Sequence, residues 1–312
     1  MTFEDLNKFG KQREPFLFFC DFEAKRVEVF PLENLEAEDI EYQIIQRYTY
    51  KNHTHFLNPL PSSFANYKKK FDKIIEKIQA GETYILNLTQ ATPIAPKKTL
   101  HEMFHLANAA YKLRFKDRFL CFSPEQFVQI KENRIHTFPM KGTINADIKN
   151  AREKILANEK ELAEHIMVVD LLRNDLSIVA KDVTVEQFRY ISEIEAGDKK
   201  LLQVSSHISG NIGKDWHESI GTILQNLLPA GSISGAPKRS TLQIIDDVEE
   251  YERGFFTGVF GVYDGEEFNS GVMIRYIEKT ADGFVYKSGG GITLESDAQA
   301  EYQELLDKIY LP

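Results

Sequence analysis

Residues 163–175 read Ala-Glu-His-Ile-Met-Val-Val-Asp-Leu-Leu-Arg-Asn-Asp. They overlap the end of the longest helical pattern of the chain, which we predict from Ala151 to Asp170. Segments typical of strands lie on both sides, from Gln126 to Ile135 and from Leu201 to Ile212. Elsewhere, helices and strands are mixed without the regular alternation that builds a parallel sheet. This order favours an α+β fold with largely antiparallel sheets.

Further elements follow from residue spacing and turn signals. Apolar residues at helical spacing predict a helix from Asn66 to Ala80, which Gly81 ends, and a last helix from about Asp297 to Ile309. The other predicted strands are two within Phe16–Phe30, then Thr83–Thr92, Gly254–Tyr263, Ser270–Ile277 and Phe284–Ser288. We interpret residues 1–312 as a single domain, in which residues 1–60 form an abbreviated N-terminal part with little functional signal.

Composition and charge limit the class of protein. The 312 residues are 42% hydrophobic and 27% charged, which is ordinary for a globular chain. No apolar run approaches the roughly 20 residues that span a bilayer, and the N-terminus lacks the features of a signal peptide. Two cysteines make no disulfide framework, so we expect a cytoplasmic protein. The net charge of −9 argues against a nucleic-acid partner, and an anionic substrate would need local cations or a metal.

Lys141 stands in the stretch Phe138-Pro139-Met140-Lys141-Gly142-Thr143, soon after a predicted strand. The proline disfavours a helix, and the Gly-Thr pair allows a sharp turn. We expect the apolar neighbours to desolvate Lys141, which would lower its pKa and free the amine as a nucleophile. The alternative is a surface lysine whose aliphatic stem lies along apolar residues.

Two segments repeat the pattern Glu-x-x-Glu on predicted helices. Residues at i and i+3 share a helix face, so each helix can present two carboxylates together. Facing helices of this kind could hold Mg²⁺, which prefers carboxylates and water. Each pair alone is also compatible with a solvated face, and Lys308 with an ordinary salt bridge to Glu304 at i+4. The four carboxylates are Glu161, Glu164, Glu301 and Glu304.

Two glycine-containing stretches could bind anions. Gly289, Gly290 and Gly291 free the backbone so that N–H groups can converge, although a flexible turn explains them equally well. The stretch Gly231–Lys238 precedes a predicted helix, whose N-terminus favours anions. Simple helix initiation is the alternative, because Pro237 suits a first turn.

Three polar residues are ambiguous when taken singly. Arg275 ends an apparent strand, where it can hold a carboxylate in a bidentate manner. His207 alternates with apolar neighbours, which is typical of a hydrogen-bonded core histidine as well as of a site residue. Glu125 would be unremarkable by itself.

Taken together, these motifs resemble the chorismate-utilising enzymes, a family that includes anthranilate, aminodeoxychorismate, isochorismate and salicylate synthases. The resemblance runs from about Asn66 to the C-terminus, and its most specific stretches are residues 163–175, 231–238 and 289–304. It implies one large α+β domain with an antiparallel β-sandwich core and outer helices. It also implies that chorismate and Mg²⁺ bind in a cleft.

The resemblance assigns roles to the residues named above. Glu161, Glu164, Glu301 and Glu304 form the metal set, with Glu164 and Glu304 in direct contact. Arg275 and the backbone of Gly289, Gly290 and Gly291 take the enolpyruvyl carboxylate. Lys308 lies near the metal end, while His207 and Ser232 line the substrate ring.

Within the family, three positions favour the aminodeoxychorismate synthase branch. Lys141 falls where that branch carries a lysine. Ile85 stands where the members that use water carry a base lysine. The motif Asn87-Leu88-Thr89-Gln90 resembles the corresponding sequence of the aminodeoxychorismate synthase branch. The implied chemistry is attack of Lys141 on C2 of chorismate, with Glu125 donating a proton to the departing C4 hydroxyl. Ammonia then adds at C4 and expels the lysine.

Partners and rivals complete the expectation. Neither cysteine lies in a glutaminase-like context, so ammonia should be free or supplied by a separate glutaminase subunit. Release of pyruvate to form 4-aminobenzoate, for folate synthesis, should need a downstream aminodeoxychorismate lyase. The rivals are an anthranilate or isochorismate synthase and a non-catalytic chorismate-binding subunit. Phe256 stands where many relatives carry tyrosine, which removes one hydroxyl from the expected site.

Overall fold

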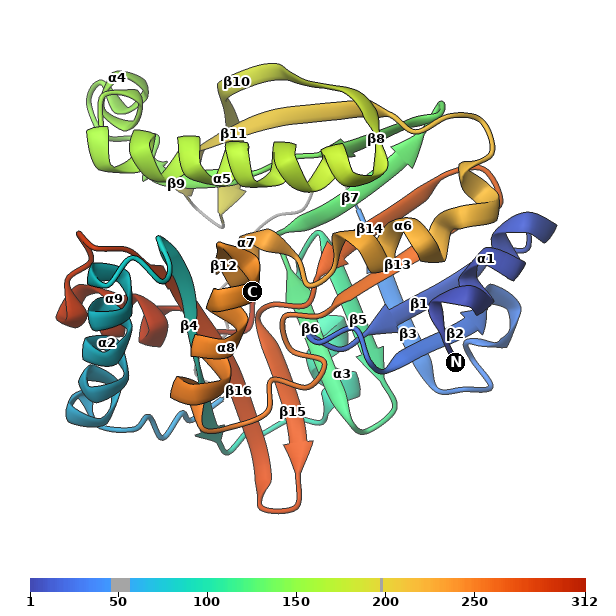
Figure 1. The fold of residues 1–312 in the computed structure, drawn as a ribbon. Helices are drawn as coiled ribbons and strands as arrows, with labels where there is room; N and C mark the ends of the chain where they lie inside the picture. Colours follow the sequence, from blue (N-terminus) through green and yellow to red (C-terminus); the bar gives the residue numbers. More distant parts are fainter. Residues whose placement is uncertain (46–56, 197–198) are drawn as a thin grey trace.

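The computed structural model describes residues 1–45, 57–196 and 199–312, and Figure 1 shows its course from the N-terminus to the C-terminus. The α-helices are α1 (Phe3–Gln12), α2 (Phe64–Gln79), α3 (Leu100–Leu106), α4 (Ala151–Leu156), α5 (Glu159–Val179), α6 (Ile220–Leu227), α7 (Gly231–Ser234), α8 (Lys238–Glu249) and α9 (Ala298–Asp307). Short 3₁₀ turns occupy Leu32–Asn34 and Trp216–Ser219.

Within the described residues, the strands form two sheets of nine and seven strands, and neighbouring strands in both sheets pair in the antiparallel direction. The first sheet contains, in spatial order, β10 (Lys181–Ala196), β11 (Lys199–Asn211), β8 (Arg134–Thr137), β7 (Gln126–Lys131), β14 (Phe268–Val272), β13 (Val259–Tyr263), β1 (Phe16–Cys20) and β2 (Val27–Pro31), with β9 (Met140–Asn145) also on β11. The second contains β12 (Gly235–Ala236), β4 (Ile85–Ile94), β16 (Gly283–Ile292), β15 (Tyr276–Thr280), β6 (Phe119–Ser123), β5 (Tyr111–Phe115) and β3 (Ile40–Ile44).

Strand β1 shows how the two-residue period of a strand builds the layers. Its side chains are buried on both faces. Phe19 points toward the second sheet, where its ring lies 4.9 Å from that of Phe115 and 5.5 Å from that of Phe119. Phe16 and Phe18 point the other way and join the core that packs beneath the helices. The sheets therefore form a sandwich, and an aromatic cluster fills the space between them.

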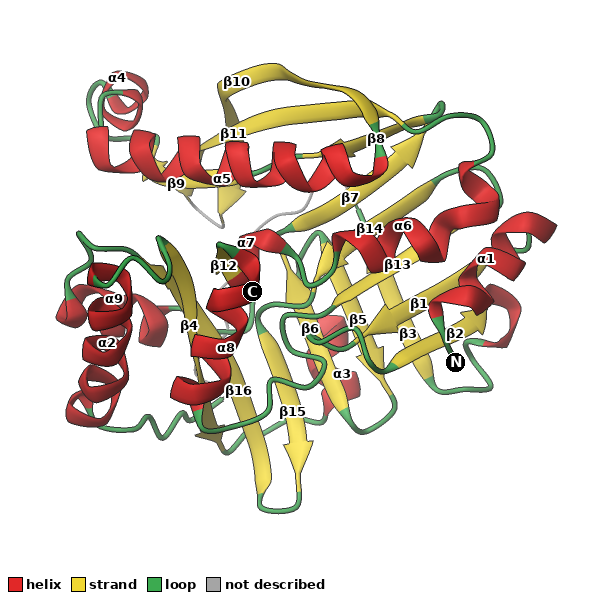
Figure 2. Ribbon diagram, in the orientation of Figure 1, coloured by secondary structure: helices red, strands yellow, loops and turns green. Residues whose placement is uncertain are grey.

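The helices cover the outer faces of this sandwich (Figure 2). Apolar residues of α1, α5 and α6, among them Leu6, Val169 and Leu224, share a buried cluster with Phe16 and Phe18 of the first sheet. Helices α2, α8 and α9 lie over strands β4 and β16 of the second sheet. No helix of the described residues is long and apolar enough to cross a bilayer. The predicted α+β sandwich with outer helices is confirmed.

Several predicted elements are confirmed in kind and corrected in extent. The segment predicted as one strand from Gln126 to Ile135 is a hairpin, because Glu132 and Asn133 adopt positive φ and turn the chain. The helix predicted from Ala151 to Asp170 is two helices. Asn158 interrupts it by capping α5, where its side chain accepts a hydrogen bond of 3.1 Å from the backbone N–H of Glu161.

The strand predicted from Ser270 to Ile277 is also divided, and this division matters for the site. Strand β14 belongs to the first sheet and β15 to the second, so the chain changes sheets between Val272 and Tyr276. Arg275 has a φ of 55° at this break. The chain crosses again between β6 of the second sheet and β7 of the first, at Pro124 and Glu125.

Candidate active site

The two crossings lie side by side and hold each other in place. The backbone N–H of Val272 donates to the carbonyl of Glu125 at 3.1 Å, and the N–H of Phe122 donates to the carbonyl of Arg275 at 3.2 Å. Two polar side chains from distant parts of the sequence are thereby fixed at the junction of the sheets. At both crossings the chain leaves the regular strands. The side chains of Glu125 and Arg275 can therefore face a cavity at the junction of the sheets.

A cavity of about 270 Å³ opens at this junction. It is lined by most of the residues that the sequence predicted for substrate and chemistry, and they come from both sheets and from helices α7 and α9. These predicted residues are Glu125, Lys141, Ser232, Arg275, Gly289, Gly290, Gly291, Glu304 and Lys308. Three cations in one small cavity suit an anionic substrate.

Lys141 lies on strand β9, which pairs with β11, and not in the sharp turn expected from its sequence. Its Nζ lies 2.5 Å from Oε2 of Glu164 on α5. Burial acts to lower the pKa of Lys141, but Glu164, Glu161 and Glu304 together outweigh burial and raise it. The expected lowering of this pKa is therefore wrong for the ligand-free chain. The sequence identified these carboxylates but did not show that they face Lys141.

At Glu125, in contrast to Lys141, the effect of burial on the pKa outweighs that of the neighbouring groups. Burial raises the pKa of its carboxyl, against the hydrogen bond from Ser232 and the charges of Arg275 and Lys308, which lower it. Ser232 donates to Oε1 of Glu125 at 2.6 Å from the short helix α7. A carboxyl with a raised pKa can hold a proton and give it to a leaving group.

The predicted metal carboxylates come from two helices. Glu161 and Glu164 lie on α5, and Glu301 and Glu304 on α9. Among the described residues, no three of these carboxylates come within 4.8 Å of one another. Glu161 Oε2 is nevertheless buried without a hydrogen-bond partner. An all-oxygen donor set with one such orphaned atom fits the ligand preference of Mg²⁺.

Lys308 connects the last helix to the glycine stretch. Its Nζ lies 2.7 Å from Oε1 of Glu304 and donates to the carbonyl of Gly289 at 2.8 Å. Burial lowers the pKa of Lys308 in spite of Glu304. The three glycines belong to β16 and pair with Asn87, Leu88 and Thr89 of β4, so the alternative of a flexible turn is wrong and the glycines lie in a regular strand.

His207 does not line the cavity. Its Nε2 lies 3.0 Å from Nδ1 of His136, and its ring stacks on Phe138 at 4.6 Å. Gln203, four residues earlier on the same strand, lines the cavity instead. Because the strand period is two, Gln203 and His207 face the same side, and only the position of the strand along its axis distinguishes them.

Three polar lining residues were not predicted as site residues, whereas the sequence placed the apolar Ile85 and Phe256 at the expected site. Asn87, Gln126 and Thr257 each bring a polar side chain to the wall, and Ile85 and Phe256 bring apolar ones. Thr257 lies immediately after Phe256 and has a positive φ of 62°, a conformation that spacing in the sequence does not reveal. Asn87 lies in the motif that extends to Gln90, so the sequence identified its position but did not predict its role.

The geometry agrees with comparisons against known proteins. Residues 14–311 match the family described as chorismate binding enzyme, and the chain belongs to that family. The family likeness therefore covers nearly the whole chain and is not limited to the part after Asn66.

Two proteins of similar sequence and one solved structure show the degree of similarity within this family. The chain is 47% identical to an uncharacterized PabA-like protein of Haemophilus influenzae, over 99% of this chain and 95% of that protein. It is 30% identical to aminodeoxychorismate synthase component 1 of Bacillus subtilis, over 80% of this chain and 55% of that protein. A 2,3-dihydroxybenzoate-specific isochorismate synthase from Bacillus anthracis shares the fold, with a TM-score of 0.71, 19% identity and coverage of 98% of this chain and 85% of that one.

Proposed function

We propose that this chorismate-utilising enzyme is an aminodeoxychorismate synthase component I, a transferase that makes 4-amino-4-deoxychorismate from chorismate and ammonia. The observation that carries the proposal is the presence of Lys141 and Glu125 in one cavity with Arg275 and Lys308. A nucleophile and a proton donor thus share a site that holds two further cations. The resemblance to aminodeoxychorismate synthases at 30% identity supports the same choice.

The proposed reaction exchanges two groups on the ring. Neutral Lys141 attacks C2, the ring double bonds shift, and the C–O bond at C4 breaks. Glu125 gives its proton to the departing oxygen, which leaves as water. Ammonia then forms a bond at C4, the double bonds shift back, and the C2–nitrogen bond to Lys141 breaks. Because the lysine occupies C2, nitrogen from ammonia is directed to C4.

The surrounding charges prepare this sequence. Arg275 and Lys308 can bind substrate carboxylates, and the backbone of Gly289–Gly291 lets the substrate approach closely. Lys141 carries a raised pKa in the ligand-free chain, so it must lose a proton before it attacks. When bound by Glu161, Glu164, Glu301 and Glu304, Mg²⁺ would supply charge neutralisation and orientation for a substrate carboxylate.

The other reactions of the family are less compatible with this cavity. Ile85 lines the wall at the position where the water-using relatives are expected to carry a base lysine, and an aliphatic side chain cannot activate water. This disfavours isochorismate synthesis. We propose that ammonia comes from a separate glutaminase subunit and that a downstream lyase releases pyruvate to give 4-aminobenzoate.

The product distinguishes these functions. Purified protein incubated with chorismate, Mg²⁺ and ammonium at mildly alkaline pH should form 4-amino-4-deoxychorismate, identified by mass-resolved chromatography. Anthranilate or isochorismate as the product would overturn the proposed specificity within the family. Binding of chorismate without any turnover, even with a glutaminase added, would support a non-catalytic subunit.

A further inference from the structure

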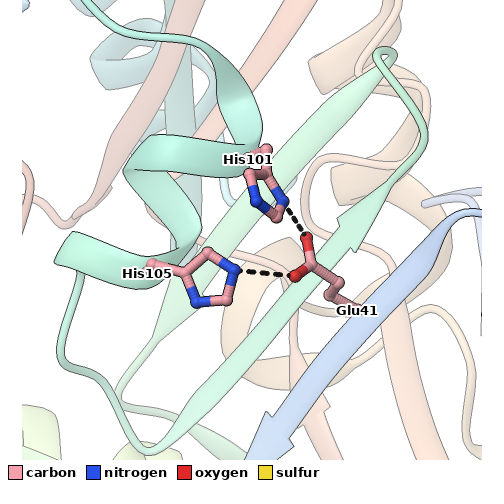
Figure 3. A group of neighbouring side chains, drawn as sticks. All are labelled: Glu41, His101 and His105. Atoms are coloured by element: carbon pink, nitrogen blue, oxygen red, sulfur yellow. Dashed lines mark hydrogen bonds and ion pairs between the residues drawn. The ribbon is translucent and has the colours of Figure 1, made fainter.

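A second group of potential metal ligands lies at the far edge of the second sheet, where strand β3 meets helix α3. His101 and His105 are separated by one helical turn on α3, and Glu41 faces them from β3 (Figure 3). His101 Nδ1 lies 2.9 Å from Glu41 Oε2, and His105 Nε2 lies 2.9 Å from Glu41 Oε1. All three ligand atoms lie within 4.8 Å of one another.

The carboxylate of Glu41 is oriented from behind. Arg114 on the neighbouring strand β5 donates from Nε to Glu41 Oε2, and its Nη2 lies 2.5 Å from Asp39 Oδ1. Its side chain is only 7% exposed. Metal-ligating carboxylates are commonly held by such hydrogen bonds, which fix their direction. Asp39 forms an ion pair with Arg114. The positive charge of Arg114 is therefore offset and does not act on the two histidines alone.

The imidazole side chains are held close together but remain open to solvent. Their ring centroids lie 4.6 Å apart at a steep angle, and the two side chains are 60% and 58% exposed. An ion could therefore reach the cluster without rearrangement of the core. Lys112 lies behind the helix and is occupied by the carbonyls of Phe104 and Ala107, at 3.0 and 2.8 Å.

We propose that Glu41, His101 and His105 form a binding site for Zn²⁺ or a similar first-row transition ion, with water as the fourth ligand. Imidazole and carboxylate ligands in this combination suit Zn²⁺, whereas Mg²⁺ prefers oxygen ligands alone. The ion joins α3 to β3 and so strengthens the edge of the second sheet. This site is separate from the carboxylates of α5 and α9 and does not depend on the proposed reaction.

The test is calorimetric titration of the metal-free full chain with Zn²⁺, beside the variants His101→Gln and His105→Gln. Both histidines are exposed, so the variants should fold. We expect binding of one Zn²⁺ per chain, weakened about tenfold or more in each variant. Co²⁺ should report the same site through visible absorption typical of four-coordinate geometry. Glu102→Gln is the matched control on α3, because Glu102 faces Thr99 and not Glu41.

A second variant separates the two cation sites. Glu164→Gln should leave the high-affinity Zn²⁺ binding and the Co²⁺ spectrum unchanged, since Glu164 lies on α5. Loss of binding in Glu164→Gln but not in the histidine variants would overturn the proposal and place the ion among the other carboxylates. Absence of Zn²⁺ binding at micromolar to millimolar concentrations would overturn it as well.

Discussion

At the scale of single residues, burial raises the pKa of the proposed acid Glu125, and the hydrogen bond from Ser232 partly offsets this effect. The protonated carboxyl is the active form, so activity is present below this pKa and is lost as the pH rises through it. Removing the bond should therefore extend activity to higher pH.

We predict that Ser232→Ala moves the alkaline limb of the pH profile of kcat/KM upward by roughly one to two units, the size expected for one hydrogen bond to a charged group. The measurement is steady-state chorismate consumption across pH. Ser234→Ala is a matched control, because Ser234 lies in the same short helix and donates to the carbonyl of Ala230. A limb that moves to lower pH would contradict the assignment of Glu125 as acid.

Replacement of the acid itself should have a larger effect. Glu125→Gln keeps the shape of the side chain but removes the proton, so kcat should fall by about 10²- to 10⁴-fold. Circular dichroism should show an unchanged fold. Retention of more than a tenth of the activity would mean that another group donates the proton.

Single residues also mark the limit of what the sequence predicts. Lys141, Glu125, Arg275, Glu304 and Lys308 were identified from motifs, and the structure brings them to one cavity. The charge state of Lys141 was not predictable, because it depends on carboxylates that reach it from two helices distant in sequence. His207 was assigned to the site from the family resemblance, whereas Gln203 lines the wall.

At the scale of elements, strand β16 is required to approach β4 very closely. A Cβ on Gly289 would lie 2.6 Å from Thr89 Cγ2 and 2.7 Å from the carbonyl oxygen of Leu88, whereas the nearest atom to a Cβ on Gly290 is 3.5 Å away. We predict that Gly289→Ala lowers the free energy of unfolding by about 1–3 kcal/mol. Gly290→Ala should change it by less than about 1 kcal/mol. Urea denaturation monitored by fluorescence compares the two, and equal losses would contradict this packing.

Elements were predicted well where the periodicity was uninterrupted. Helix α2 follows a regular apolar pattern and was predicted close to its true bounds. Strand β13 was predicted with the correct end at Tyr263, but its start was placed at Gly254 instead of Val259. Strand β10 was not predicted, because three register shifts along its pairing with β11 break the two-residue period. The crossing at Arg275 was not predicted. Apolar residues that suit a buried strand lie on both sides of it, so residues 270–277 were predicted as one strand.

At the scale of the whole molecule, one buried ion pair joins the parts that carry the site. Arg253 and Glu249 are each 2% exposed, with 2.7 Å between Nη2 and Oε1. Arg253 also donates to the carbonyls of Asn87 on β4 and Ile233 on α7, at 2.6 and 3.0 Å. Helix α8, strand β4 and helix α7 are thereby held around the cavity.

We predict that Arg253→Met lowers the free energy of unfolding by about 3–5 kcal/mol, because Glu249 would stay buried without its partner. Lys68→Met is the control, since the pair of Lys68 with Asp72 is about half exposed and should contribute less than about 1 kcal/mol. Urea unfolding measures both variants. A loss in Arg253→Met no larger than in the control would show that the ion pair does not organise the molecule.

The central claim is that Lys141 bonds to C2 of the substrate and thereby directs ammonia to C4. Intact-protein mass spectrometry after incubation with chorismate and Mg²⁺, without ammonia, tests it most directly. We predict a species heavier than the chain by the mass of chorismate less one water, with the modification on Lys141 and absent in Lys141→Ala. An adduct that persists in Lys141→Ala, or 4-amino-4-deoxychorismate formed at an undiminished rate by that variant, would contradict the account.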